Sequence, residues 1–266
     1  MSNRRPRNLP LPLVIPGLVA VAFLALPLLV LLVQTPWSDF PDIVQSPTVV
    51  TALRLSLGTS LAATAIAAVF GVPLAWLLAR DALPATALVR ALVIVPLLLP
   101  PVVSGVALLV ALGRRGLAGA VLFDAFGWQL PFTTAGVIVA EAFVAMPFLI
   151  ITLEGGFRAG NRRYEEAART LGATPWLVFR RISLPLVMPS LVAGLVLTWA
   201  RALGEFGATM TFAGNFPGVT QTMPLAVYQA LETDRSAAIA MSVLLLVVSV
   251  SVLVALRGRY TNAGAA

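Results

Sequence analysis

Long apolar segments separated by short polar ones dominate the chain. A membrane-spanning helix needs about 20 mostly apolar residues. Six segments approach or exceed this length, at about residues 11–33, 53–79, 92–112, 133–153, 189–212 and 237–256. The pattern therefore predicts an all-α membrane protein with six transmembrane helices.

The first segment, 11–33, is predicted to be a retained transmembrane helix. A signal peptide has only about 7 to 15 apolar residues and then a cleavage site with small residues. Here the apolar run is longer and ends in Gln34-Thr35-Pro36-Trp37.

Arginine positions indicate the orientation of these spans. Counted with the N-terminus inside, thirteen arginines fall in cytoplasmic segments, and four lie on or near the outer side: Arg54, Arg114, Arg115 and Arg235. Short cytoplasmic loops carry an excess of basic residues. We therefore expect both termini to be cytoplasmic.

Composition excludes several kinds of chemistry. The 266 residues are 59% hydrophobic and 11% charged, and they include no Cys or His, while the sequence shows all 18 basic residues to be Arg. A zinc site of the usual ligands, a Ser-His-Asp triad and a lysine-dependent nucleotide loop are thus ruled out. ATP-driven work would need a partner chain. The net charge of +7 forms no continuous basic face, so we expect no nucleic-acid partner. We expect one polytopic membrane domain over residues 1–266, in contact with the lipid bilayer.

The longest polar stretch, residues 154–185, lies between the fourth and fifth predicted spans. Good helix formers run from Tyr164 to Leu171, and Gly172 suits a helix end where φ turns positive. A helix of two turns is not stable alone, so packing or a partner must hold it.

This stretch resembles the cytoplasmic loop signature of permeases from binding-protein-dependent ABC importers. The signature is Glu-Ala-Ala, three residues, Gly, nine residues and Ile-x-Leu-Pro. The matching positions are Glu166, Ala167, Ala168, Gly172, Ile182, Leu184 and Pro185. The resemblance implies a type I ABC importer permease fold with a coupling helix, Glu165 to Gly172, seated in a groove of the ATPase subunit.

The same resemblance implies the partners. They are two copies of an ATPase subunit that binds the ATP, a second copy of this chain, and an extracytoplasmic binding protein, all at a bacterial inner (plasma) membrane. It implies no catalytic, cofactor-binding or metal-binding residue in this chain, which would be a transport subunit and not an enzyme.

A second group of residues begins inside the fifth predicted span. Arg201 and Glu205 are four residues apart, so they can face each other on one side of a helix. Charges are costly in hydrocarbon, which favours an internal pair over direct substrate contact. Further along are residues suited to a translocation path or to helix packing: Gly204, Gly207, Thr209, Thr211 and Asn215. Hydroxyls and amides bind a dianion without the trap that net charge would create.

From about residue 53 to 256, the chain also resembles the permease subunit of molybdate importers. Stretches 96–105, 112–116, 201–218 and 222–228 carry this resemblance. Sulfate permeases share a Gly-Glu-Phe-Gly-like element, but the extension through Gly214-Asn215 and Pro217-Gly218 favours molybdate. Sulfate, thiosulfate or tungstate remain alternative cargoes, and a stand-alone channel or ion-coupled carrier is the alternative of another class.

Three features leave their roles open. Pro96, Pro100 and Pro101 must interrupt the helix of the third span, as a gate hinge or as a static kink. Glu141 falls inside the fourth span, where it either pairs with an arginine or marks a misplaced helix boundary. Arg114 and Arg115 are expected to contact a docked binding protein or to attract oxyanions.

Overall fold

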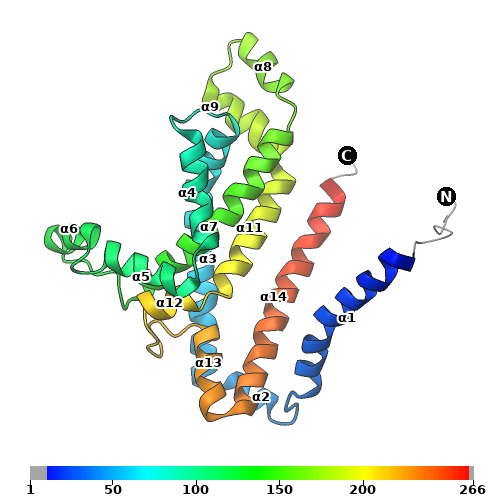
Figure 1. The fold of residues 1–266 in the computed structure, drawn as a ribbon, viewed down its shortest axis with the longest axis vertical. Helices are drawn as coiled ribbons and strands as arrows, with labels where there is room; N and C mark the ends of the chain where they lie inside the picture. The colour runs from blue at the N-terminus through cyan, green and yellow to red at the C-terminus, as the bar shows by residue number, and fades with distance from the viewer. Residues whose placement is uncertain (1–10, 264–266) are drawn as a thin grey trace.

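The computed structural model describes residues 11–263, which form helices and no strand (Figure 1). In chain order the helices are α1 (Leu11–Val33), α2 (Phe40–Gln45), α3 (Pro47–Ala79), α4 (Thr86–Leu98), α5 (Pro101–Leu112), α6 (Leu117–Phe126), α7 (Thr134–Ala159), α8 (Arg163–Thr170), α9 (Pro175–Val178), the π-helix η1 (Phe179–Ser183), α10 (Leu184–Leu186), α11 (Met188–Leu203), α12 (Gly207–Phe212), α13 (Met223–Thr233) and α14 (Arg235–Ala263).

Helices α3, α7 and α11 form the central bundle. Small residues recur at every fourth position of α3, at Ala63, Ala67, Gly71 and Ala75, and all are buried. A Cβ added to Gly71 would lie 3.2 Å from Ile150 Cγ1 in α7. Small residues let helix backbones approach closely in a membrane, where lipid is as apolar as the helices. This stripe explains why α3 packs along α7.

The end of the molecule that carries α8 is hereafter the α8 end. The central bundle is filled there by large apolar side chains that include Leu149, Leu153 and Phe157 of α7. At the opposite end, α2 and α13 lie close to the start of α14 (Figure 1). A second core cluster, with Val49, Met223 and Met241 among its members, joins α3, α13 and α14 there.

Helix α1 lies beside α14 at the edge of the molecule (Figure 1). None of its residues is buried, although it is the most apolar helix by mean hydropathy among the four long spans. An apolar helix of this length agrees with the transmembrane helix predicted for residues 11–33.

The six predicted spans are confirmed with two corrections. Four helices (α1, α3, α7 and α14) are long and apolar enough to cross a membrane, and two bent pairs raise the number to six. The predicted interruption of the third span, 92–112, is confirmed, but the chain turns by 119° between α4 and α5, which is more than a kink within one helix. Pro100 and Pro101 lie at this break, and proline lacks the N–H that would continue the helix.

The fifth span, 189–212, was wrong as a single helix. Helix α11 ends at Leu203, and after Gly204 to Phe206 the chain starts the separate helix α12. At the other end of α11, the segment Pro175–Leu186 meets it at 76°. Glycine at 204 lowers the cost of leaving the helix at that point.

Helices α5 and α12, which follow the two breaks, cross each other beside the bundle (Figure 1). A Cβ added to Gly105 of α5 would lie 2.7 Å from Thr211 Cβ and 2.8 Å from the Ala208 carbonyl oxygen. A Cβ added to Gly207 of α12 would lie 2.7 Å from Pro101 Cβ. Both glycines are therefore needed for this close crossing.

Candidate functional site

Helix α8, residues 163–170, confirms the short helix predicted at 164–171. Its end is a Schellman motif: the Gly172 N–H donates to the Arg169 carbonyl (3.0 Å) and the Ala173 N–H donates to the Ala168 carbonyl (3.0 Å). Gly172 has φ +84°, as its predicted place at a helix end requires. Glycine takes this conformation without the steric cost that a Cβ brings.

Two faces of α8 differ sharply. One face is open: Glu166 and Ala167 are exposed, and Tyr164 and the adjoining Leu171 keep 59% and 88% of their surface accessible. On the other face Glu165 is buried. The open face therefore presents two large apolar side chains beside the motif residues.

The buried face of α8 is held by charge-assisted hydrogen bonds. Arg80, at the end of α3, donates to both carboxylate oxygens of Glu165, with Nε 3.0 Å from Oε2. The Ser183 hydroxyl donates to Glu165 Oε1 at 2.8 Å. Burial opposes ionisation of this carboxyl, but the hydrogen bonds from Arg80 and Ser183 and the charges of Arg80 and Arg169 outweigh it, so its pKa is lowered.

The rest of the signature lies after α8, around a π-helix that the sequence pattern did not predict. Ile182 is in η1 and Leu184 and Pro185 are in α10. Ile182 and Leu184 are half-buried and Pro185 is exposed. Phe179 of η1 packs against Trp76 and Trp176, with ring centroids 5.5 and 5.7 Å away. The signature therefore occupies a bent connection braced by aromatic rings.

Arg201 and Glu205 form the predicted ion pair, with Arg201 Nη1 2.5 Å from Glu205 Oε2. The two residues do not share one helix, because Glu205 lies in the break after α11. Glu205 Oε1 accepts a hydrogen bond from the Ala208 N–H in the first turn of α12 (2.8 Å). The carboxylate thus joins the end of α11 to the start of α12.

The remaining candidate path residues differ in their surroundings. Gly204 is exposed, whereas Gly207 is buried against α5. Thr209 is fully buried, with a hydroxyl that has no hydrogen-bond partner in the described structure. The Thr211 hydroxyl donates to the Gly207 carbonyl (2.8 Å). The Asn215 amide donates to Gln229 Oε1 at 3.4 Å, while its own oxygen is buried without a partner in residues 11–263.

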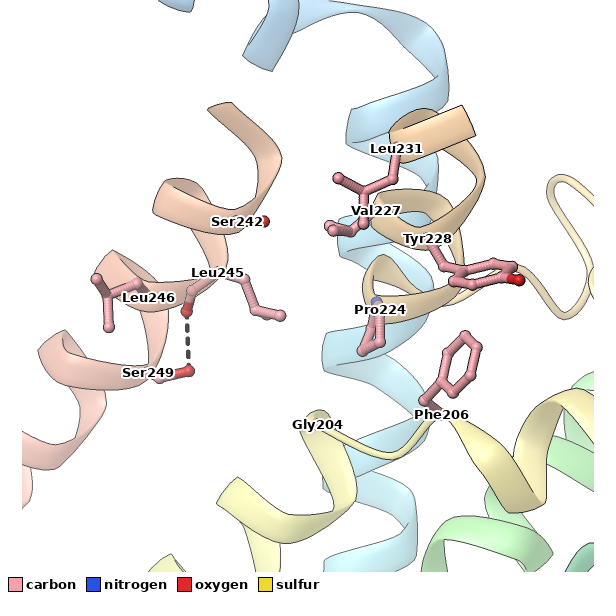
Figure 2. A pocket seen from close by; sticks show the side chains of 10 residues that line it. All are labelled: Gly204, Phe206, Pro224, Val227, Tyr228, Leu231, Ser242, Leu245, Leu246 and Ser249. Carbon is pink, nitrogen blue, oxygen red and sulfur yellow. Dashed lines mark hydrogen bonds between the residues drawn. The ribbon is translucent and has the colours of Figure 1, made fainter. Parts of the chain in front are cut away.

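A cavity of about 480 Å³ opens beside the break after α11. Figure 2 shows it between α14 on one side and α13 with the Gly204–Phe206 segment on the other. Its lining is mostly apolar, and the Ser249 hydroxyl is turned to the Leu245 carbonyl of its own helix (2.8 Å). The break is thus bordered by open space on one side and by packed helices on the other.

Both explanations offered for Glu141 were wrong. It lies well inside α7 and is 1% exposed, and it forms no ion pair within the described residues. Its Oε1 accepts a hydrogen bond from the Thr59 hydroxyl of α3 at 2.9 Å. A neighbouring hydroxyl, and not a cation, therefore donates the hydrogen bond to one oxygen of the Glu141 carboxyl group.

Arg114 and Arg115 are exposed in the turn between α5 and α6. The Arg114 guanidinium lies over the Phe123 ring, 4.2 Å from its centroid. A cation–π contact of this kind orients the side chain within its own turn.

Sequence reasoning missed the partners of the buried carboxylates. Arg80 was used only to assign the orientation, and no role was assigned to Ser183 and Thr59, or to Gly105 at the crossing of α5 and α12. The sequence did contain a signal for Arg80. It is the first charged residue after a long apolar span, so its side chain must lie near the polar loops. The other three carry no pattern that distinguishes them from ordinary helix-packing residues.

Comparison with known proteins identifies the family. Residues 71–259 match the model of the family described as binding-protein-dependent transport system inner membrane component. The molybdenum transport system permease protein ModB of Mycobacterium tuberculosis (strain ATCC 25618 / H37Rv) is 44% identical over 254 residues, covering 96% of each chain. The sulfate transport system permease protein CysT of Escherichia coli (strain K12) is 36% identical over 223 residues, covering 84% of this chain and 80% of its own.

Solved structures show the same fold. A bacterial ABC transporter involved in the import of the acidic polysaccharide alginate matches with a TM-score of 0.73 at 19% identity, covering 94% of each chain. The MetNI methionine ABC transporter, in inward-facing conformations, matches with a TM-score of 0.65 at 19% identity, covering 81% of this chain and 95% of its own. The chain is a multi-pass membrane protein with the type I ABC importer permease fold, and it belongs to the family of binding-protein-dependent transport system inner membrane components.

Proposed function

We propose that this chain is the membrane-spanning subunit of an ABC importer that moves molybdate into the cytoplasm of a bacterium. The observation that carries the proposal is the end-to-end match to molybdenum permeases, 44% identical over 96% of the chain. The match to sulfate permeases is lower, at 36% over 84% of the chain. In this proposal the chain carries out no covalent chemistry and binds no cofactor of its own.

The open face of α8 supports docking of an ATPase subunit. Tyr164 and Leu171 expose large apolar surface beside the motif residues Glu166 and Ala167. Exposed apolar side chains rimmed by polar ones are typical of a surface that a partner covers. The chain itself lacks the lysine of a nucleotide-binding loop, so the ATP would be bound by that partner. Two copies of this chain would dock two ATPase subunits.

The arginine excess supports a cytoplasmic location for the α8 end. With thirteen arginines against four, both termini and α8 fall on the cytoplasmic side. The opposite end, with α2 and α13, would then face the oxyanion-binding protein.

The breaks after α4 and α11 support a translocation path for the anion whose shape can change. Each is followed by a short helix, and those two helices cross at Gly105 and Gly207. Non-helical backbone within a membrane is tolerated only where protein or a water-filled cavity surrounds it. Thr209 is buried in this conformation, so in this proposal a rearrangement of α12 brings its free hydroxyl to a passing anion.

Uptake by cells that express the complete transporter tests the cargo. We expect radiolabelled molybdate uptake that tungstate competes with fully and that excess sulfate reduces little. Efficient competition by sulfate or thiosulfate would instead favour the alternative cargo. Uptake by this chain without any ATPase would overturn the importer assignment in favour of a channel or an ion-coupled carrier.

A further inference from the structure

The contacts of Glu165 form one buried junction between α8 and the membrane helices. We define the Arg80 junction as Arg80, Glu165, Ser183 and the Phe157 carbonyl. Arg80 holds both oxygens of Glu165 and also donates from Nη1 to the Phe157 carbonyl of α7 at 3.2 Å. Ser183 of η1 donates to the same carboxylate. The junction therefore joins α8 to α3, α7 and η1.

Glu165 is the one residue of α8 that is buried in the described structure. The side chains of Arg80 and Glu165 are only 12% and 8% exposed, and the two residues are 85 positions apart in the chain. A guanidinium that holds both oxygens of a carboxylate fixes the orientation of the two groups as well as their distance. The Arg80–Glu165 pair therefore ties the buried side of α8 to the end of α3, where Arg162 before α8 also donates to the Ala79 carbonyl (2.9 Å).

We propose that the Arg80 junction transmits displacement of α8 to the transmembrane helices, with Arg80, Glu165 and Ser183 as positioning residues. This inference rests on the proposed function as an ATPase-driven permease. Through Arg80 the displacement reaches α3, and through Ser183 it reaches η1. Short π-helical segments often mark functional sites in helices, and η1 precedes the 76° turn into α11, the helix that carries Arg201.

The test uses the complete transporter in liposomes, with ATP hydrolysis and oxyanion uptake measured in the same vesicles. In Glu165→Gln and Arg80→Ala we expect the rate of ATP hydrolysis to stay close to that of the wild type. The amount of oxyanion taken up per ATP should fall about tenfold, which is within the range of typical coupling between two sites. Uptake per ATP equal to wild type in both variants would overturn the proposal.

Glu154→Gln is the matched control. Glu154 is a similarly buried carboxylate, 8% exposed, and it pairs with Arg90 (2.9 Å) and Arg158 (3.1 Å) of α4 and α7. It joins two membrane helices without α8, so uptake per ATP should stay at the wild-type value. An equal fall in this control would mean that any buried ion pair at the α8 end matters, and would reject a specific role for the junction.

A reversible cross-link tests the same point if single variants assemble poorly. The natural chain has no cysteine, so Arg80→Cys with Glu165→Cys introduces the only thiols of this chain. Bridging them with a short bifunctional thiol reagent should restore uptake per ATP that the unbridged variant has lost. A bridge that leaves uptake as low as before would refute transmission through this point. Failure of the wild-type complex to take up any oxyanion would contradict the proposed function instead.

Discussion

Two arginine–glutamate pairs with buried carboxylates lie in different regions of this protein, and they are held differently. Arg80 and Glu165 are 85 residues apart and lie where α3 ends and α8 begins. Arg201 and Glu205 are four residues apart and lie at the break between α11 and α12. Glu165 receives donors from Arg80 and Ser183 on its two oxygens. Glu205 Oε2 is close to a single cation, Arg201.

The difference shows what each arginine contributes. Glu165 lies outside the membrane spans, and if Arg80 is lost it keeps the hydrogen bond from the Ser183 hydroxyl (2.8 Å). Glu205 is 1% exposed within an apolar segment, and its Oε2 has no hydrogen-bond partner in the described residues. Removing one member of a buried pair leaves an uncompensated charge, and this costs more than the intact pair contributes. Loss of arginine should therefore be more damaging at the broken helix than at the α8 end.

The largest expected effect is that of Arg201→Ala. It leaves the Glu205 carboxylate without a cation, and we expect a loss of about 3 kcal/mol of folding stability. The measurement is the thermal unfolding midpoint of the detergent-purified protein, together with its yield in the membrane.

Arg201→Ala combined with Glu205→Gln is the control for this prediction. Glutamine keeps an acceptor for the Ala208 N–H, which Glu205 now satisfies at 2.8 Å, and it removes the stranded charge. We expect the double variant to be more stable than the single one. The reverse order would show that Arg201 acts through something other than Glu205.

The same two pairs show how far sequence alone could predict the site. Spacing of four residues was enough to predict the Arg201–Glu205 pair, because helical geometry brings such residues together. It did not predict that the helix ends between them, since Gly204 is compatible with either a helix or a break. The Arg80–Glu165 pair could not be predicted from the sequence, because it depends on how α3 and α8 meet in three dimensions.

The second prediction concerns the helix that Glu205 caps. Gly207→Ala places a Cβ 2.7 Å from Pro101 Cβ of α5, so one of the two helices must shift. Overpacking of this kind costs about 1 to 3 kcal/mol, and the shift should also weaken the bond from Glu205 to α12. The measurement is the thermal unfolding midpoint of Gly207→Ala. The control is Gly155→Ala in α7, where an added Cβ meets nothing within 4 Å. Equal stability of the two variants would contradict a close crossing of α5 and α12.

The third prediction uses a buried carboxyl with no arginine partner. Glu141→Gln keeps an acceptor for the Thr59 hydroxyl, so we expect stability near that of wild type. Glu141→Ala leaves that hydroxyl only its longer hydrogen bond to the Ser56 carbonyl of α3 (3.4 Å), at a cost of about 1 to 2 kcal/mol. A glutamine variant as unstable as the alanine variant, by unfolding midpoint, would mean that Glu141 acts through a carboxyl oxygen that glutamine does not replace.

Sequence reasoning was strongest for the overall architecture and weakest for junctions between distant segments. Apolar length alone located α1 at residues 11–33, because burial in lipid requires little beyond hydrophobicity. The 119° turn after α4 was only half-predicted: Pro100 and Pro101 required an interruption, but the direction of α5 depends on its packing against α12. The role of Thr59 depends on an α3–α7 register that no local pattern encodes.

The smallest expected effect is the pH dependence of the pair at the α8 end. Because the pKa of Glu165 is lowered in the folded protein, its ionisation stabilises the fold at any pH above the ordinary glutamate pKa of about 4.3. This stabilisation is lost as the pH falls through the lowered pKa, where the carboxylate becomes protonated. Glu165→Gln keeps an acceptor for Arg80 and Ser183, so we expect it to be less stable than the wild type by a constant margin of about 1 kcal/mol from pH 8 to pH 5. The margin should shrink only in more acidic buffer. A margin that already vanishes between pH 7 and pH 5 would mean that Arg80 and Ser183 do not stabilise the carboxylate.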